Sequence, residues 1–449
     1  MRSPLSLESA VASIANRCAR THRQGLGPGL AVVLTHRSGW CEVMAHGTAN
    51  VVTGQPVTED TVFQIGSVSK VVTAAALLRL VEMRSIDLSA PVTDYLDWFE
   101  VRSEYEPITL HHLLTHTAGL VSLIDTVSAS EHAVWQLRDT ETGFAPGTRF
   151  HYSNMGYLVL GLVLAAVTGH SYADTVATLV FEPLGMSASS GASPGHCRPP
   201  LACGHERRDG AAMPVLPASI TGGHAGVVST PTDLSVLLRM LLDEGGGYLA
   251  TSSALCMTRG SVTTDWPCYD YGYGLFSGRI ETLGGHRIIQ HGGENPGFEA
   301  VMIGDLDTGF GVGVFVNSYE QPWELAQKAL RILQAVDPQG LSSDPPHGAN
   351  RDQSDSRCPP PPEQSRHPLA GRYRAHATLL TDFAVLEDGM ALVLESGDGY
   401  RQPLTHLEGH TYTIGDPPTP ERLTFGPFVD SRVLACAIGG GTYSRVESE

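Results

Sequence analysis

The sequence predicts a mixed α/β (α+β) protein in which one antiparallel sheet is flanked by helices, carries a helical insert, and is followed by a small all-β domain. Three observations support this prediction. Strand patterns lie near the start and the end of the first 336 residues, with helical patterns between them. A stretch rich in Pro, Ser, Asp and Gln then breaks the pattern, and short alternating segments with regular turn signals follow it. We therefore expect a sheet-and-helix domain over 1–336, a linker over 337–366, and a small barrel or sandwich over 367–449.

The sheet is expected from strands at both ends of the first domain. The first two are GLAVVLTH (29–36) and CEVMAHGTAN (41–50), joined by RSGW. Late in the domain, RIETLGGHRIIQH (279–291) is typical of a hairpin with a two-glycine turn, and residues 298–318 are typical of a second hairpin. Strands at both ends with helices between them imply one sheet built from both ends of the domain.

Helical patterns account for much of the segment between these strands. They are expected at residues 68–84, 109–115, 155–168, 172–180 and 231–243, and a closing helix is expected at 322–336. The stretch HHLLTH places His112 and His116 four residues apart, but no glutamate completes a zinc-binding H-E-x-x-H motif. We interpret these histidines as packing and hydrogen-bonding groups, and we expect neither a metal nor another cofactor.

Composition excludes several classes of function. Apolar residues make up 42% of the 449 residues and charged residues 17%, which is typical of a soluble globular protein. The net charge is 29 − 47 = −18, which disfavours nucleic acid as a partner. We see no secretory signal and no run of about 18 apolar residues, so we expect a cytoplasmic protein without a membrane span. Eight scattered cysteines without a C-x-x-C motif indicate reduced thiols. The sequence does not indicate an oligomeric state.

The stretch FQIGSVSK (63–70) places Ser67 three residues before Lys70, at the start of a helical pattern. Residues three apart share one face of a helix, so the two side chains should point the same way. A serine hydroxyl is a weak nucleophile until a base takes its proton, and a lysine with a lowered pKa can be that base. The alternative interpretation is a helix-capping serine followed by a surface lysine.

Two further motifs contain groups suited to catalysis. In FHYSNMGYLVLG, Tyr152 and Asn154 lie just ahead of a helical pattern; a phenol can act as a general base, and an amide can orient a substrate carbonyl. The alternative is a buried tyrosine with a helix-capping asparagine. In IIQHGGENPGFEA, a strand leads into His291 and two glycines, which allow a ligand to approach the backbone. The alternative there is an ordinary hairpin turn.

The ordered set Ser-x-x-Lys, Tyr-x-Asn and His-x-Gly resembles the serine β-lactamase and penicillin-binding-protein superfamily. The resemblance is strongest to class C β-lactamases, D,D-peptidases, D-aminopeptidases and related esterases, and it covers about residues 8–335. It implies that Ser67 is the nucleophile that accepts the acyl group, and that Lys70 and Tyr152 activate it. By the same resemblance, Asn154 contacts the substrate and Lys70, and His291 hydrogen-bonds Tyr152 or the substrate. The tail resembles the lipocalin-like β-domains appended to some members.

The resemblance also implies an oxyanion hole made by the backbone N–H groups of Ser67 and of Glu294, the residue after Gly293. Such donors contribute about 3 kcal/mol each to stabilisation of a tetrahedral intermediate. The third motif departs from the Lys-Thr-Gly of the β-lactamases. A lysine there suits a substrate carboxylate, whereas histidine is mostly uncharged at neutral pH. This difference favours ester or amide substrates that lack the carboxylate.

Three functions remain open from the sequence. The main hypothesis is a serine hydrolase that forms an acyl-enzyme with a small-molecule or peptide ester or amide. A second is an acyltransferase or peptide cyclase that passes the acyl group to an amine or alcohol. A third is a binding protein without catalytic activity.

Overall fold

The fold was determined as a computed structural model that describes most of the chain. In the first 336 residues it describes 5–123, 129–191, 201–205, 218–319 and 322–336. Beyond them it describes 367, 369–375, 383–388, 391–396, 401–415, 421–426, 428–429, 432–433, 435–438 and 441–446. The predicted linker at 337–366 lies outside the described residues.

The chain divides into two compact units. The first contains Met1–Leu96, Thr109–Thr115 and Tyr157–Ser354, and the second contains Asp97–Ile108, His116–Gly156 and Asp355–Glu449. The second unit therefore combines two segments from the first third of the chain with the C-terminal region. The predicted domain boundaries at 336 and 367 stay a prediction.

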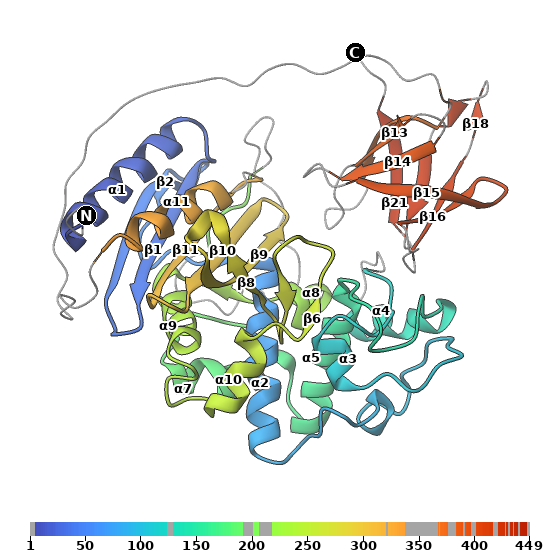
Figure 1. Ribbon diagram of the computed structural model, residues 1–449, viewed down its shortest axis with the longest axis horizontal. Coiled ribbons are helices and arrows are strands. Elements are labelled where there is room, and N and C mark those ends of the chain that lie inside the picture. Colours follow the sequence, from blue (N-terminus) through green and yellow to red (C-terminus); the bar gives the residue numbers. More distant parts are fainter. Residues whose placement is uncertain are drawn as a thin grey trace. The chain divides into compact units, whose positions relative to one another are not determined.

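A nine-stranded sheet forms the centre of the first unit (Figure 1). Its order is β3 (Gln55–Pro56), β2 (Cys41–Asn50), β1 (Gly29–His36), β11 (Phe310–Val316), β10 (Phe298–Asp305), β9 (His286–Asn295), β8 (Phe276–Ile280), β7 (Asp270–Tyr271) and β6 (Val262–Thr263). Each neighbouring pair is antiparallel. The N-terminal strand β1 lies between β2 and β11, which confirms the prediction of one sheet built from both ends of the domain.

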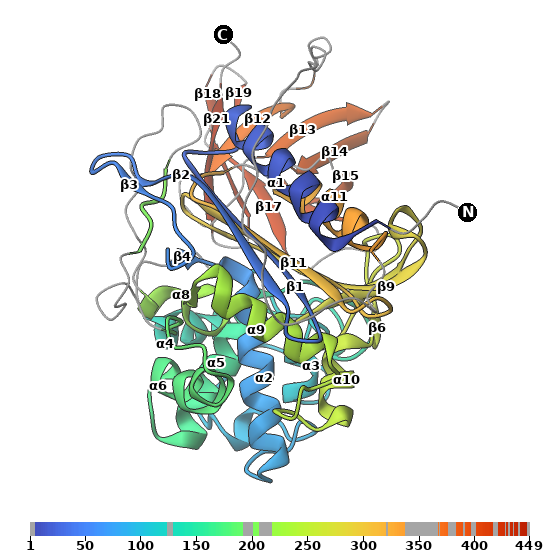
Figure 2. The same ribbon diagram turned by 90° about the vertical axis from the view of Figure 1, so that its left-hand side faces the viewer.

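Helices cover both faces of this sheet, which explains why every residue of β1 is buried. Figure 2 shows α1 (Leu7–Arg23) and α11 (Trp323–Leu333) on one face, and α2 (Ser69–Glu82) and α9 (Pro231–Leu242) on the other. A strand buried on both faces must be apolar on both, so GLAVVLTH is a nearly continuous apolar run. The helix α2 is buried along almost its whole length, in keeping with its AAALLRL sequence.

Seven further helices are described, and all but α5 (Asn154–Thr168) are short. They are α3 (Leu110–Leu114), α4 (Ser130–Trp135), α5, α6 (Tyr172–Val176), α7 (Glu182–Leu184), α8 (Ala218–Ala225) and α10 (Thr251–Thr258). The predicted helix at 172–180 is α6 followed by a π-helical turn, Ala177–Phe181. Within the described residues, no single helix has the length and hydropathy of a membrane span, although α5 and the 172–184 segment, bent by 79°, meet both conditions together.

The predicted two-glycine turn between β8 and β9 is longer than expected. The register pairs Ile280 with His286, so five residues connect the strands. The first three, Glu281–Leu283, form a 3₁₀ turn. Gly284 and Gly285 follow with φ of 77° and 71°, a conformation that suits glycine.

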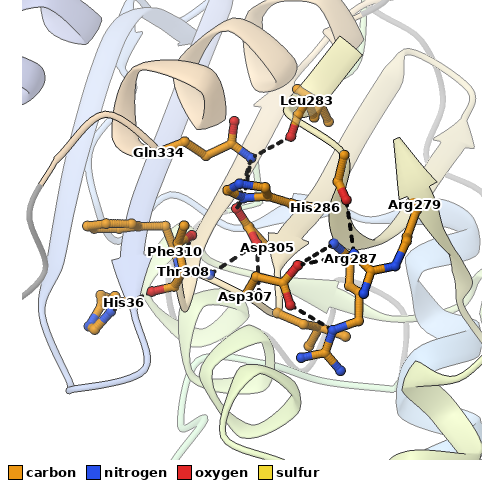
Figure 3. A network of polar contacts seen from close by, with 12 residues as sticks. His36, Arg279, Leu283, His286, Arg287, Asp305, Asp307, Thr308, Phe310 and Gln334 are labelled. Carbon is orange, nitrogen blue, oxygen red and sulfur yellow. Dashed lines mark hydrogen bonds and ion pairs between the residues drawn. The ribbon is translucent and has the colours of Figure 1, made fainter. Parts of the chain in front are cut away.

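A polar network lies where β10 turns into β11 (Figure 3). The fully buried Asp305 carboxylate accepts hydrogen bonds from the His286 ring (2.7 Å) and the Gln334 amide (2.8 Å). It also accepts the backbone N–H groups of Asp307 (2.9 Å) and Thr308 (3.2 Å). The network thus ties the turn to the start of β9 and to the end of α11.

The C-terminal region forms a closed eight-stranded barrel, which confirms the prediction of a small all-β domain. Its strands in order are β12 (Gly371–Ala375), β13 (Phe383–Asp388), β14 (Ala391–Ser396), β15 (Arg401–Glu408), β16 (Thr411–Ile414), β17 (Arg422–Phe425), β20 (Ala435–Ile438) and β21 (Gly441–Val446). Two short pairs lie outside both sheets: β4 (Phe63–Gln64) with β5 (Val228–Ser229), and β18 (Phe428–Val429) with β19 (Arg432–Val433).

Candidate active site

Ser67 lies in a short 3₁₀ turn, η1 (Gly66–Val68), directly ahead of α2. The residue is partly exposed, whereas its neighbours on both sides are buried. Gly66 has φ of +49°, in the region that favours glycine. The turn therefore presents one hydroxyl to solvent from an otherwise buried backbone.

Lys70 lies in the first turn of α2 and is fully buried. Its Nζ is 2.9 Å from Ser67 Oγ and 3.1 Å from the backbone oxygen of His224. The ring of Tyr157 lies 5.5 Å away, measured from Nζ to the ring centroid. Burial lowers the pKa of the Lys70 amine well below its ordinary value. A lysine with a lowered pKa can lose its proton and then accept the proton of the Ser67 hydroxyl.

The backbone at Ser67 packs directly against the backbone of β9. A Cβ on Gly66 would lie 2.4 Å from the Glu294 nitrogen, and a Cβ on Gly293 would lie 2.7 Å from the Ser67 nitrogen and 1.9 Å from the Ile65 oxygen. Both positions therefore require glycine. The packing brings the backbone nitrogens of Ser67 and Glu294 into one neighbourhood, as an oxyanion hole would require.

His291 is buried in β9, close to Lys70. Its Nδ1 lies 2.6 Å from the Gly292 oxygen, so Nδ1 carries the hydrogen and Nε2 accepts from the Tyr271 hydroxyl at 3.3 Å. Burial, together with the positive charge of Lys70, lowers the pKa of His291 to about 3. The ring is therefore neutral at physiological pH. Glu294, the residue named for the oxyanion hole, is exposed to solvent.

The segment 222–228 completes the surroundings of Ser67, and the sequence did not identify it as part of the site. It supplies the His224 carbonyl that contacts Lys70. Ser69 fastens it to η1, because its hydroxyl donates to the Gly66 oxygen (2.6 Å) and accepts the Val227 N–H (3.0 Å). Asn295 donates to the Ala225 oxygen (3.1 Å). Most of these contacts involve backbone atoms, for which a single sequence carries no signal.

Tyr152 and Asn154 belong to the second unit, and their predicted roles beside Ser67 stay predictions. Within that unit the ring of Tyr152 packs on the ring of His116, with centroids 4.3 Å apart. His116 has φ of 57°, and its Nδ1 accepts the Ser153 N–H at 3.0 Å. The Asn154 N–H donates to the Ser122 oxygen at 2.7 Å. His116 is thus a packing and hydrogen-bonding group, as the sequence predicted.

Across the part of the chain that the structure describes, no three or more His, Cys, Asp or Glu side chains are grouped so that they could hold a metal ion. The described site places a serine hydroxyl beside a buried amine.

The chain matches a known protein family over most of its length. Residues 16–337 match the family described as Beta-lactamase. Esterase EstB of Burkholderia gladioli is 37% identical over 180 residues, which are 35% of this chain and 45% of the esterase. Penicillin-binding protein 4 of Amycolatopsis lactamdurans is 30% identical over 239 residues, 50% of this chain and 62% of that protein. The chain thus spans about half the length of these curated relatives.

Among solved structures, the octameric penicillin-binding protein homologue from Pyrococcus abyssi has the same fold. The superposition has a TM-score of 0.65 and covers 98% of this chain and 100% of the other, at 23% sequence identity.

Proposed function

This chain belongs to the β-lactamase family of serine hydrolases, and from that premise we propose that it cleaves ester or amide substrates through an acyl-enzyme on Ser67. The observation that carries the proposal is the 2.9 Å contact between the Ser67 hydroxyl and the fully buried Lys70 amine. A solvated surface lysine would stay protonated and could not act as a base. The buried Lys70 amine, whose pKa is lowered, can act as a base.

In the proposed reaction, Ser67 Oγ attacks the carbonyl carbon of the substrate while Lys70 Nζ takes the hydroxyl proton. The carbonyl oxygen becomes an oxyanion and accepts hydrogen bonds from the N–H groups of Ser67 and Glu294. When the intermediate collapses, the bond to the leaving alcohol or amine breaks, and Lys70 or Tyr152 returns a proton to the leaving group. Water then attacks the acyl-enzyme, releases the acid and restores the Ser67 hydroxyl.

The state of His291 favours a particular substrate class. A neutral imidazole can donate or accept a hydrogen bond, but it offers no positive charge to a substrate carboxylate. With the pKa of His291 lowered to about 3, this holds across the physiological pH range. We therefore propose that the substrates are esters or amides without the carboxylate that penicillins carry. The name of the Burkholderia relative, an esterase, supports this choice.

The proposal is tested with a panel of acyl donors: a short-chain ester, a D-amino-acid amide, a peptidyl thioester and a penicillin. We expect turnover of the ester or the amide by the wild-type protein and none by Ser67→Ala, with circular dichroism showing that the variant is folded. Retained turnover in Ser67→Ala would refute the assignment.

The same panel, repeated with an added amine or alcohol, tests where the acyl group goes. Free acid as the only product identifies a hydrolase. A coupled ester or amide product would instead identify the acyltransferase or cyclase reaction.

A further inference from the structure

The second unit contains a buried carboxylate that the proposed chemistry does not use. Glu421 lies immediately before β17 of the barrel and is only 7% exposed. Its Oε1 lies 2.9 Å from Nε2 of His151 and accepts the backbone N–H of Ser122 at 2.7 Å. Both partners come from the segment 116–156 rather than from the barrel. Glu421 therefore joins two stretches of chain that are about 270 to 300 residues apart in sequence.

These partners adjoin the second motif. His151 directly precedes Tyr152 in the sequence. The Ser122 hydroxyl donates to the Tyr152 backbone oxygen (2.9 Å), and the Ser122 oxygen accepts the Asn154 N–H (2.7 Å). The N–H of Ser122 thus donates to Glu421, while its hydroxyl and its carbonyl oxygen hydrogen-bond to the backbone of Tyr152 and Asn154.

The contact is electrostatically strong. Burial alone would raise the pKa of Glu421, but the charge and hydrogen bond of His151 and the Ser122 N–H outweigh burial and lower the pKa to about 2. A buried carboxylate deprived of these partners would be costly, so the contact resists separation. The Glu395–Arg401 pair of the same barrel differs, because its arginine is exposed and such pairs contribute little.

We propose that Glu421 is a positioning residue through which the C-terminal barrel holds Tyr152 in its reactive geometry. The inference rests on the proposed function, in which Tyr152 shares the activation of Ser67. Glu421 acts through His151 and Ser122 and touches no reacting atom. By this proposal the barrel contributes to the rate of Ser67 acylation and not only to substrate binding.

The test is a double-mutant cycle with Glu421→Gln and Tyr152→Phe, read as the rate of Ser67 acylation in single turnovers. We expect Glu421→Gln to lower that rate about 10- to 100-fold in the wild-type background while the substrate dissociation constant changes by less than about twofold. In the Tyr152→Phe background the same change should have almost no further effect, because the group that it positions is already gone.

Two other variants complement the cycle: one is a control and the other is an independent test. Glu395→Gln, on the surface of the same barrel, should leave acylation unchanged. Ser122→Ala keeps the N–H that binds Glu421 but removes the hydroxyl that holds Tyr152. It should slow acylation less than Glu421→Gln does, and again only when Tyr152 is present. Ser122→Ala serves as the test if Glu421→Gln does not fold.

The outcomes separate the inference from the proposed function. Slowing by the same factor in both backgrounds, or wild-type acylation in Glu421→Gln while Tyr152→Phe is impaired, would overturn the positioning role alone. Wild-type acylation in Tyr152→Phe would refute the role assigned to Tyr152, and the inference with it.

Discussion

Two fully buried ionisable groups of the first unit, Lys70 and Asp305, are treated in opposite ways by their surroundings. The Asp305 carboxylate accepts hydrogen bonds from two side chains and two backbone N–H groups (Figure 3). Lys70 lies against a hydroxyl, a carbonyl and an aromatic ring, and burial lowers its pKa. The surroundings of Asp305 supply four hydrogen-bond donors, whereas the surroundings of Lys70 disfavour its charged form.

The difference shows how burial can serve structure at one place and chemistry at another. A carboxylate with a full set of donors fixes a turn and strengthens the fold. An amine whose charged form is disfavoured is a weaker base, but more of it is unprotonated at neutral pH and ready to take a neighbouring proton, which is typical of active sites. Four substitutions, taken in order of decreasing effect, separate residues that serve the chemistry from residues that serve stability.

Lys70→Met should have the largest effect. It keeps the length of the side chain but removes the base, so we expect acylation of Ser67 to slow by about 10³-fold or more. The free energy of unfolding should stay the same or rise, since a buried amine is replaced by an apolar group. Single-turnover acylation and urea unfolding measure the two effects. A strongly destabilised variant would show that Lys70 is a structural residue.

Gly293→Ala should come next. Its new Cβ would meet the Ile65 oxygen and the Ser67 nitrogen and would separate the two backbones that form the proposed oxyanion hole. We expect acylation to fall by about 10²- to 10³-fold, the usual cost of one lost donor. Gly285→Ala, in a turn with φ of +71° and no close neighbour, is the control. It should cost about 1 kcal/mol of stability without changing acylation.

Asp305→Asn should affect stability instead of chemistry. The amide cannot accept all four hydrogen bonds, so we expect a loss of about 3 kcal/mol in the free energy of unfolding, with acylation per folded molecule unchanged. The partly exposed Asp307, which pairs with Arg287 and Arg279, supplies the control. Asp307→Asn should cost less than about 1 kcal/mol. Equal losses of unfolding free energy in Asp305→Asn and Asp307→Asn would show that burial does not make the Asp305 hydrogen bonds more important.

The lowered pKa of His291 predicts that the stability of the fold depends on pH. The unfolded chain binds a proton at this ring below about pH 6.5, whereas the folded protein does so only near pH 3. Stability should therefore fall as the pH falls from about 6.5 to about 3, by about 2 kcal/mol between pH 6.5 and 5. Urea unfolding of wild type and His291→Gln over this range measures it. Parallel curves for the two proteins would contradict a buried neutral imidazole.

The sequence predicted much of this fold because local patterns encode it. The apolar run of β1, the apolar α2 and the alternating strands of the barrel are each visible in short windows. The helix α1 was not predicted, although Ser6 caps it through the Ser9 N–H and its core face holds Ala10, Ile14 and Cys18. The two-glycine turn was misjudged because Glu281–Leu283 form a 3₁₀ turn that propensity does not indicate.

For the candidate site, the sequence indicated the side chains and, by resemblance, the two backbone N–H groups of the oxyanion hole, but not the backbone packing that surrounds them. The Ser67–Lys70 spacing is visible in a short window of sequence. The need for glycine at Gly66 depends on β9, which lies more than 200 residues further along the chain. The role proposed for Glu421 also depends on residues distant in sequence, because its partners come from another part of the second unit. Contacts of this kind arise only from tertiary packing.

In the proposed reaction, burial of the Lys70 amine is what activates Ser67. The most direct test of this activation is the rate at which a neutral, serine-directed fluorophosphonate labels Ser67 as a function of pH, followed by intact-mass spectrometry. We predict that labelling of the wild-type protein reaches its plateau well below pH 10.5, the ordinary pKa of a lysine, and that Lys70→Met is labelled slowly at every pH. Labelling that still rises toward pH 10.5, or that is as fast in Lys70→Met as in wild type, would contradict the claim.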